Sequence, residues 1–406
     1  MKIKTCINCK KNKLVKIFSL GKLCFSGRFA KNFKENIPSE KLNIIFCKNC
    51  KLVQLDRSFD PNYLYGDGYG YKTGSNKTMT DHVNYTVKKI TKLVKLNKYD
   101  CVLDIASNDG TLLNFYPSKV VKVGIDPLVN KYKKYYKSIN HKVSNFFNIN
   151  DIKKLRLKKK FKIVTALSVF YDLRNPNKFL KEVKQILDKD GIFVLEHADL
   201  YSILKNNIFD TICHEHLSYY SSSIIINMMK KNGLRVFSHE FNNINGGSSR
   251  YYICHMNSKY KSNKSIKHIL NKEFKYKLGL PKTLKIFFKK IINLNVKLVK
   301  LIKKIKKNNQ TIHGYGASTK GNILLQFCKI GNKEIDFIAD RNSLKFNLFT
   351  PGTKIKIISE KESRSIKPNY YLVLPWHFKK EILKREIKIR KKGVKFIFPL
   401  PKIEII

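Results

Sequence analysis

The chain has 406 residues, more than one hydrophobic core usually holds, and 43% of them are apolar, so two or three folded domains are expected. Its formal charge of +53 would suit nucleic acid, but only ten of the 82 basic residues are Arg, and the lysines are spread through every segment. Because planar phosphate recognition favours Arg, we expect solvated surface lysines and no dedicated nucleic-acid partner.

The sequence also carries no signal for a membrane or an export route. Met1 leads to Cys6 without an apolar signal region, and six lysines interrupt the apolar stretch 286–305. We therefore expect a soluble, cytoplasmic protein without a membrane partner. In that compartment, nine cysteines argue against a disulfide framework.

Two cysteine pairs organise the segment 1–60. Each pair, Cys6 with Cys9 and Cys47 with Cys50, has the C-x2-C spacing that turns two thiolates toward one point. Two such turns predict a closed, tetrahedral, structural zinc site. We expect this metal to replace the hydrophobic core that so short a segment cannot build, and Cys24 to be an apolar filler.

An aromatic, glycine-rich stretch at Tyr63–Tyr71 follows, in a linker segment 61–97. Loops of this kind often carry function, although each tyrosine could equally serve packing. Apolar residues at helical spacing then predict an amphipathic helix over 80–96.

A doubly wound α/β domain is predicted over 98–256. A strand at 99–105, a tight turn, a helix at 111–116 and a strand at 120–125 follow one another, and further strands at 161–167 and 191–196 flank a helix at 176–187. Asp126 ends the second strand, where such folds place an acidic residue against ribose hydroxyls. The turn has carboxylates at Asp104 and Asp109 and lacks the G-x-G-x-x-G glycines, which favours a phosphate-free adenosine cofactor, S-adenosylmethionine, over a dinucleotide.

The C-terminal part repeats this organisation. A Lys-rich helical connection is expected over 257–310, and a second Rossmann-like α/β domain over 311–406. Its glycine turn at Gly314 and Gly316, with Lys320, would suit a phosphate at a helix N-terminus. The alternative is a purely architectural domain.

Several motifs in this order resemble one family, the class I S-adenosylmethionine-dependent sugar C-methyltransferases, which methylate carbon 3 of nucleotide-linked 4-keto-deoxysugars. The resemblance covers nearly the whole chain and is carried by the two cysteine pairs and by 103–113, 124–127, 209–219, 245–248 and 314–322. Two residues depart from it: Ala106 stands where the family usually has Gly, and Cys213 where its antibiotic-sugar branch has Tyr.

The resemblance implies a base-catalysed methyl transfer to carbon. A base removes the proton beside a ketone, and the enolate takes the methyl group. It assigns His216 as the general base, Glu215 as an orienting or polarising group, His214 as a support, and Tyr69 or Tyr71 as a sugar-binding or enolate-stabilising residue. If 214–216 is extended, the two histidines share one face; if it is helical, they diverge.

The expected ligand contacts form three sets. The zinc ligands are Cys6, Cys9, Cys47 and Cys50. The cofactor residues are Asp104, Ala106, Asn108, Asp109, Gly110, Asp126, Pro127, Ser168 and Phe170. The residues for a nucleotide-linked sugar are Gly247, Arg250, Gly316, Lys320 and Asn322.

Other functions stay open at this point. A catalytic metal on the His-Glu-His run is disfavoured, because three consecutive side chains cannot readily face one ion. The alternatives are an O- or N-methyltransferase acting on a related sugar nucleotide and a non-catalytic, zinc-containing nucleic-acid-binding protein. A monomer or small homo-oligomer working in deoxysugar or polysaccharide biosynthesis is expected.

Overall fold

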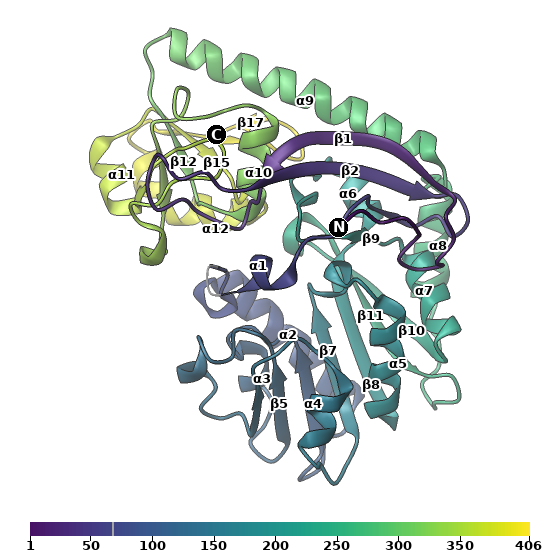
Figure 1. The fold of residues 1–406 in the computed structure, drawn as a ribbon. Helices are drawn as coiled ribbons and strands as arrows, with labels where there is room; N and C mark the ends of the chain where they lie inside the picture. The colour runs from purple at the N-terminus through teal and green to yellow at the C-terminus, as the bar shows by residue number, and fades with distance from the viewer. Residues whose placement is uncertain (67–68) are drawn as a thin grey trace.

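Three β-sheets form the framework of the protein, in a computed structural model that describes residues 1–66 and 69–406. Figure 1 shows the central and C-terminal domains as two bodies, with the N-terminal hairpin reaching over both. The predicted α/β class with a zinc module and two Rossmann-like domains is confirmed. None of the helices among the described residues is long and apolar enough to cross a membrane.

The N-terminal module is a small antiparallel sheet. Its strands are β1 (Leu14–Cys24), β2 (Ser39–Cys47) and β3 (Val53–Leu55), and β9 (Ser218–Tyr219) joins them from the central domain. Phe18, Leu42 and Phe46 are almost fully buried in it. The module therefore has an apolar core as well as the cysteine cluster, so the expectation that metal would replace a core is wrong: the neighbouring domains supply the missing partners.

The central domain is a seven-stranded sheet in the order β10-β11-β8-β7-β4-β5-β6. Strands β4 (Cys101–Ile105), β5 (Val121–Ile125), β6 (His141–Val143), β7 (Phe161–Leu167) and β8 (Leu187–Ala198) are parallel, whereas β10 (Leu234–Asn242) and β11 (Ser248–His255) form an antiparallel hairpin. The helices are α2 (Lys77–Leu93), α3 (Thr111–Asn114), α4 (Ile149–Lys154), α5 (Pro176–Ile186), α6 (Leu200–Lys205) and α7 (Ser222–Lys231). Since β4, β5 and β7 end at one edge, the turns that follow them meet there.

The C-terminal domain is a six-stranded sheet in the order β14-β13-β12-β15-β16-β17. Its strands are β12 (Ile312–Tyr315), β13 (Phe337–Asp340), β14 (Ile357–Ser359), β15 (Tyr370–Val373), β16 (Lys395–Phe398) and the antiparallel β17 (Glu404–Ile405). The helices are α10 (Thr319–Phe327), α11 (Glu360–Ile366), α12 (Lys379–Arg385) and α13 (Ile387–Arg390). The order shows a second doubly wound unit beside the first.

Two helices, α8 (Ser265–Lys275) and α9 (Pro281–Lys307), connect these domains. The buried residues of α9 recur every three or four positions from Leu284 to Ile305, so one stripe faces the protein while lysines cover the other side. Phe18 of β1 stacks on Phe288 of α9 with ring centroids 4.8 Å apart. The helix therefore lies along the hairpin between the two domains (Figure 1).

The N-terminal module also contacts the C-terminal domain directly. Gln326 of α10 accepts a hydrogen bond from the Cys24 amide at 2.6 Å and donates one to the Cys24 carbonyl at 3.2 Å. Ala30 and Phe349 exchange two backbone hydrogen bonds of 2.9 and 2.8 Å. These contacts fix the module against both Rossmann units, with one large cavity between them.

Candidate active site and zinc centre

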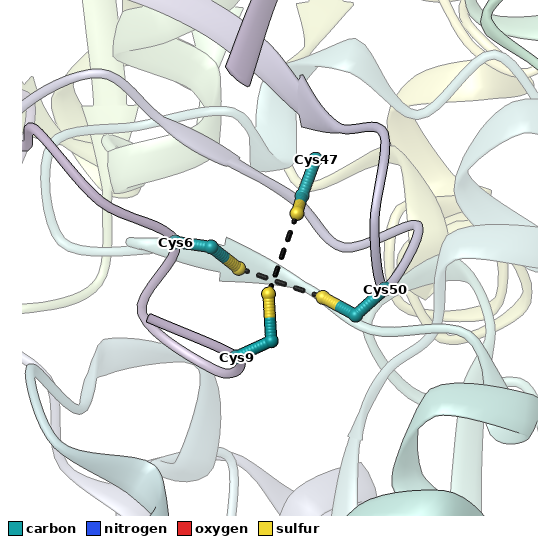
Figure 2. A group of neighbouring side chains, drawn as sticks. All are labelled: Cys6, Cys9, Cys47 and Cys50. Atoms are coloured by element: carbon teal, nitrogen blue, oxygen red, sulfur yellow. Dashed lines mark hydrogen bonds between the residues drawn. The ribbon is translucent and has the colours of Figure 1, made fainter. Parts of the chain in front are cut away.

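The four paired cysteines converge on one point (Figure 2). The Sγ atoms of Cys6 and Cys50 are 3.5 Å apart and those of Cys9 and Cys47 are 3.6 Å apart, and all four lie within 4.8 Å of one another. Tetrahedral zinc with Zn–S bonds of about 2.3 Å requires sulfurs roughly 3.8 Å apart, so the geometry fits a closed structural zinc site. Cys24 lies apart from this group, bonded through its backbone to Gln326.

A cavity of about 900 Å³ lies at the carboxyl ends of the central strands and extends to the C-terminal domain. Asp126 follows β5 and accepts hydrogen bonds from the Asn108 amide at 2.9 Å and the Leu128 amide at 2.7 Å. Burial raises the pKa of Asp126 to about 6 and that of Asp104, bonded to Thr165, to about 7. A carboxylate fixed at the end of the second strand suits the ribose of a nucleoside.

The turn after β4 is strained at Ala106, whose φ of 59° lies in the left-handed region. A glycine would take this conformation without the Cβ cost of about 1 kcal/mol. The departure from the family at this position is therefore accommodated by backbone strain, and the turn keeps its shape.

Six of the nine predicted cofactor residues line the cavity, and three do not. Those that line it are Asp104, Ala106, Asn108, Asp126, Pro127 and Ser168. Asp109 instead accepts a 2.9 Å hydrogen bond from the Gly74 amide, and the Thr73 amide donates to Asn108 at 2.9 Å. Gly110 packs on Tyr136, and Phe170 is completely buried in the core. Asp109 thus anchors the segment that covers the turn.

The turn suits S-adenosylmethionine better than a dinucleotide. Carboxylates of Asp104 and Asp126 face the space that the cofactor would fill, and they would repel a pyrophosphate. Asp126 is placed to bind ribose hydroxyls, while a sulfonium and an amino group are favourable neighbours for the carboxylates. The residues present therefore fit this cofactor.

The predicted catalytic run lies in a loop between the 3-10 helix Phe209–Thr211 and β9. The Nδ1–H of His216 donates to the Thr211 carbonyl at 2.7 Å, which leaves Nε2 as the acceptor nitrogen. The His216 ring lies 4.1 Å from that of Tyr171, and both line the cavity. Burial lowers the pKa of His216 to about 3, so its imidazole is neutral at physiological pH.

His214 points away from this cavity. Its Nε2–H donates to the Glu40 carbonyl at 3.2 Å, and its ring packs between Phe25 and Phe59 at 4.6 and 4.9 Å. The loop is neither extended nor helical, and it turns Glu215 and His216 toward the same space. His214 is not among the residues that line the cavity, and the contacts of its side chain are with the N-terminal module.

Two carboxyl groups face the cavity near the base. Glu215 is 5% exposed and lies against Gly27, where an added Cβ would come 2.8 Å from its Oε1 atom. Burial raises the pKa of Glu215 and of Asp172, and the negative charge of Glu215 raises the pKa of Asp172 further. Within the described residues, Glu215 Oε2 and Asp172 Oδ1 have no hydrogen-bond partner.

Aromatic hydroxyls surround these carboxyl groups. Tyr69 and Tyr71 both line the cavity, and Tyr69 packs on Tyr65 with ring centroids 5.4 Å apart. Asp67 and Gly68, in the same predicted stretch, lie outside the described residues. Tyr171 follows the strand 161–167, where the sequence predicts a residue beside the cofactor, whereas Tyr65 was not singled out within the aromatic stretch 63–71.

The predicted substrate residues separate into two groups. Gly316 and Lys320 line the cavity, whereas Gly247, Asn322 and Arg250 do not. Asn322 donates a 2.7 Å hydrogen bond to the Ser26 carbonyl. Gly247 packs against Ser202.

Arg250 corrects the prediction most clearly. It is 1% exposed in β11, with Nε 2.6 Å from Glu196 and Nη1 2.7 Å from Glu240. Its guanidinium is therefore committed to a buried ion-pair network and is closed to a substrate.

The second Rossmann unit repeats the nucleoside geometry of the first. Asp340 ends β13 and accepts hydrogen bonds from the Ala317 and Asn342 amides, both at 2.7 Å. Asp126 makes the same pair of contacts with Asn108 and Leu128. Both carboxylates line the same cavity, one from the central domain and one from the C-terminal domain. Each end of the cavity therefore has a strand-end carboxylate of the kind that suits a nucleoside.

Three family models match successive parts of the chain. A zinc binding domain matches residues 6–65, a methyltransferase domain matches 79–239, and a C-methyltransferase C-terminal domain matches 243–401. The first range contains the cysteine cluster, and the second contains strands β4 to β8 of the central sheet. The third contains β11 of that sheet, the two connecting helices and the C-terminal sheet without β17.

Individual proteins match the chain over very different lengths. The C-methyltransferase NovU of Streptomyces niveus is 27% identical over 367 residues, which cover 90% of this chain and 87% of NovU. A tRNA U34 carboxymethyltransferase of Campylobacter jejuni is 31% identical over 105 residues, 24% of this chain and 34% of that protein. A solved structure of PKMT2 from Rickettsia typhi with AdoHcy covers 45% of this chain and 55% of its own, at 15% identity and a TM-score of 0.35.

These findings overturn the non-catalytic alternative. A methyltransferase domain and a C-methyltransferase C-terminal domain match most of the chain after the cysteine cluster. The chain is an S-adenosylmethionine-dependent methyltransferase enzyme, in which regions similar to a zinc-binding domain and to a C-methyltransferase C-terminal domain lie before and after the methyltransferase domain.

Proposed function

We propose that the protein transfers a methyl group to a carbon beside the ketone of a nucleotide-linked deoxysugar. One observation carries this proposal: His216 keeps a neutral Nε2 acceptor inside a cavity whose two ends resemble nucleoside sites. The similarity to NovU, a C-methyltransferase, supports carbon as the atom that accepts the methyl group. A working place in the cytoplasm, in deoxysugar or polysaccharide biosynthesis, belongs to the same proposal.

The cavity has room for two ligands. About 900 Å³ is near the upper end of the volumes that enclose single drug-sized ligands. We place S-adenosylmethionine at Asp104 and Asp126, where its sulfonium supplies an electrophilic methyl group. We place the nucleoside of the sugar substrate at Asp340 in the C-terminal domain, where Arg341 and Lys345 bring positive charge for a diphosphate. The keto-sugar then lies between them, beside His216.

The residues around His216 suit it as the general base. The Thr211 carbonyl fixes the ring and the tautomer, because it holds the Nδ1 proton. His216 Nε2 takes the proton from the carbon, and the C–H electron pair moves into the enolate. Burial raises the pKa of Glu215 and of Asp172, which favours their neutral forms, and a neutral carboxyl group can donate a hydrogen bond to a sugar oxygen. Tyr69 and Tyr71 stay proposed as further sugar contacts.

Proton exchange tests this assignment without the cofactor. The protein is incubated in D2O with dTDP-4-keto-6-deoxyglucose, and loss of the C3 and C5 proton signals is followed by NMR. We expect exchange by the unaltered protein, a fall of at least about 100-fold in His216→Asn, and unchanged S-adenosylmethionine affinity in that variant.

The outcome also separates carbon from heteroatom transfer. An O- or N-methyltransferase would methylate a sugar nucleotide in the presence of labelled S-adenosylmethionine without exchanging any carbon-bound proton. Methyl transfer without exchange would therefore contradict the carbon assignment, and full exchange by His216→Asn would remove His216 from the base role.

A further inference from the structure

Lys320 reaches out of its own domain into the catalytic centre. The residue lies in the first turn of α10 in the C-terminal domain, where the glycine turn predicted a phosphate contact. Its Nζ instead donates a 2.7 Å hydrogen bond to the carbonyl of Asn245, in the 3-10 helix Ile244–Gly246 of the central domain. Asn245, His216 and Lys320 all line the interdomain cavity.

The half-buried side chain of Lys320 lines the cavity, and its ammonium group has no ion pair among the residues that the structure describes. Among the described residues no carboxylate oxygen lies within 4.0 Å of its Nζ atom, and the Asn245 carbonyl is its one hydrogen-bond partner. The carboxyl group that interacts most strongly with the charge of Lys320 is that of Asp210, and one of its oxygens already accepts a 2.7 Å hydrogen bond from Trp376. Two of the three ammonium protons therefore have no protein acceptor.

The charge of Lys320 acts on titratable groups of the cavity. The positive charge of Lys320 contributes, after burial, to the lowered pKa values of His216 and His377. Burial lowers the pKa of Lys320 itself, while the nearby acidic groups of Asp210 and Cys213 oppose that shift and favour the ammonium form. In the resting protein the charge of Lys320 makes His216 a weaker base, which by itself would slow proton removal. The charge assists the reaction only if an anion forms beside both groups during turnover.

We propose that Lys320 is a catalytic residue that donates a hydrogen bond to the ketone oxygen of the sugar and stabilises the enolate. The inference rests on the proposed carbon transfer. When His216 takes the proton, the C–H electron pair becomes the C=C bond, and the carbonyl π pair moves to oxygen. The Lys320 ammonium faces the resulting oxyanion. When the enolate carbon forms its bond to the methyl group, the S–CH3 bond would break and leave its electron pair on sulfur, while the C=O bond re-forms and the charge on oxygen disappears.

This role differs from phosphate binding. Arg341 and Lys345 line the cavity at the Asp340 end, so the C-terminal domain has other cations for a diphosphate. Lys320 is directed across the domain interface, to the strand-connecting segment at Asn245. The C-terminal domain thus completes the chemical site as well as the nucleotide site.

The experiment compares Lys320→Met, Lys320→Arg and the control Lys333→Met in the full-length protein. Lys333 is exposed just beyond α10, so its substitution removes the same charge without entering the cavity. The C3 and C5 exchange rates with saturating dTDP-4-keto-6-deoxyglucose in D2O are measured, together with the affinity for that compound and for S-adenosylmethionine. We expect Lys320→Met to exchange about 100- to 1,000-fold more slowly, with both affinities changed less than about threefold.

The pH profile supplies a readout that a structural role would not move. Loss of the cation should raise the pKa of His216, so the acid limb of the exchange rate in Lys320→Met should move to higher pH. Lys320→Arg keeps the charge and should recover at least about tenfold of the lost rate, which keeps the proposal testable if the Met variant unfolds. Lys333→Met should match the unaltered protein.

Each contrary outcome has its own meaning. If Lys320→Met exchanges at the normal rate, or loses only affinity for the sugar nucleotide, the catalytic role of Lys320 is overturned while carbon transfer stands. If the unaltered protein methylates the compound without exchange, the proposed function fails first. If Lys320→Arg is as slow as Lys320→Met although both remain folded, charge stabilisation is refuted.

Discussion

Replacing Arg250 by Met should destabilise the central domain strongly without altering its ligands directly. The side chain is 1% exposed and links Glu196 on β8 to Glu240 on β10. Methionine fills a comparable length of apolar space but supplies no charge. Glu240 would keep its contacts with Lys89 and Tyr252, whereas Glu196 would keep only His82 and Asn242.

The size of the effect follows from the burial of Glu196. Removing one partner of a buried ion pair costs about 3–5 kcal/mol, because the other charge stays desolvated. For a domain of this size each kcal/mol lowers the melting temperature by about 2–4 °C. We therefore expect Arg250→Met to melt roughly 6–20 °C lower. Lys89→Met, whose lysine side chain is 39% exposed, should cost at most about 1 kcal/mol.

Thermal unfolding by circular dichroism, with each domain followed by hydrogen exchange, measures this difference. The double variant Arg250→Met with Glu196→Gln should be more stable than Arg250→Met alone, because the uncompensated carboxylate is gone. A normal melting temperature for Arg250→Met, combined with a large rise in KM for the sugar nucleotide, would refute this reasoning and restore Arg250 to the substrate site.

Three further predictions concern the metal, the cofactor and pH. Cys6→Ser should lower zinc from one equivalent to well below one by metal analysis, whereas Cys24→Ser should keep it; equal content in both would contradict the site. Asp126→Ala should weaken S-adenosylmethionine binding about 10- to 100-fold by calorimetry, while Asp340→Ala should leave it unchanged; the reverse order would exchange the two pockets. Because the pKa of His216 is lowered to about 3, its basic form predominates above that pH, so the exchange rate should show no acid limb between pH 5 and 8, unlike a histidine titrating near 6.5.

The parts of the fold that local chemistry determines could be predicted from the sequence. Strand β4, its turn and Asp126 were recognisable because apolar runs, turn residues and strand-end carboxylates lie close together in the chain. The paired cysteines were recognisable for the same reason, since each pair forms one turn. The four strands of the N-terminal sheet were missed, because β1 and β2 have irregular pairing and depend on α9 for cover.

The site residues were harder wherever orientation depends on distant partners. His214 and His216 are two positions apart, yet Phe25 and Phe59 hold one ring while Thr211 and Tyr171 hold the other. Spacing alone cannot distinguish such neighbours. Arg250 was misplaced for a related reason, because a charged residue on a strand can face a ligand or an internal partner, and only the position of Glu196 decides.

The pairing of β3 with β9 has a consequence for biosynthesis. Val53 and Gln54 hydrogen-bond to a strand that contains Tyr219 and Ser218, so the first sheet gains its last strand only after about 160 further residues have been made. At roughly 5–20 residues per second, ribosomes need about 8–30 seconds for that length. During this time the four zinc-binding cysteines of a nascent chain belong to a sheet that still lacks its fourth strand. If zinc binds early, it binds before the loop that carries His216 has been made, and the zinc-bound module is then the surface on which that loop folds.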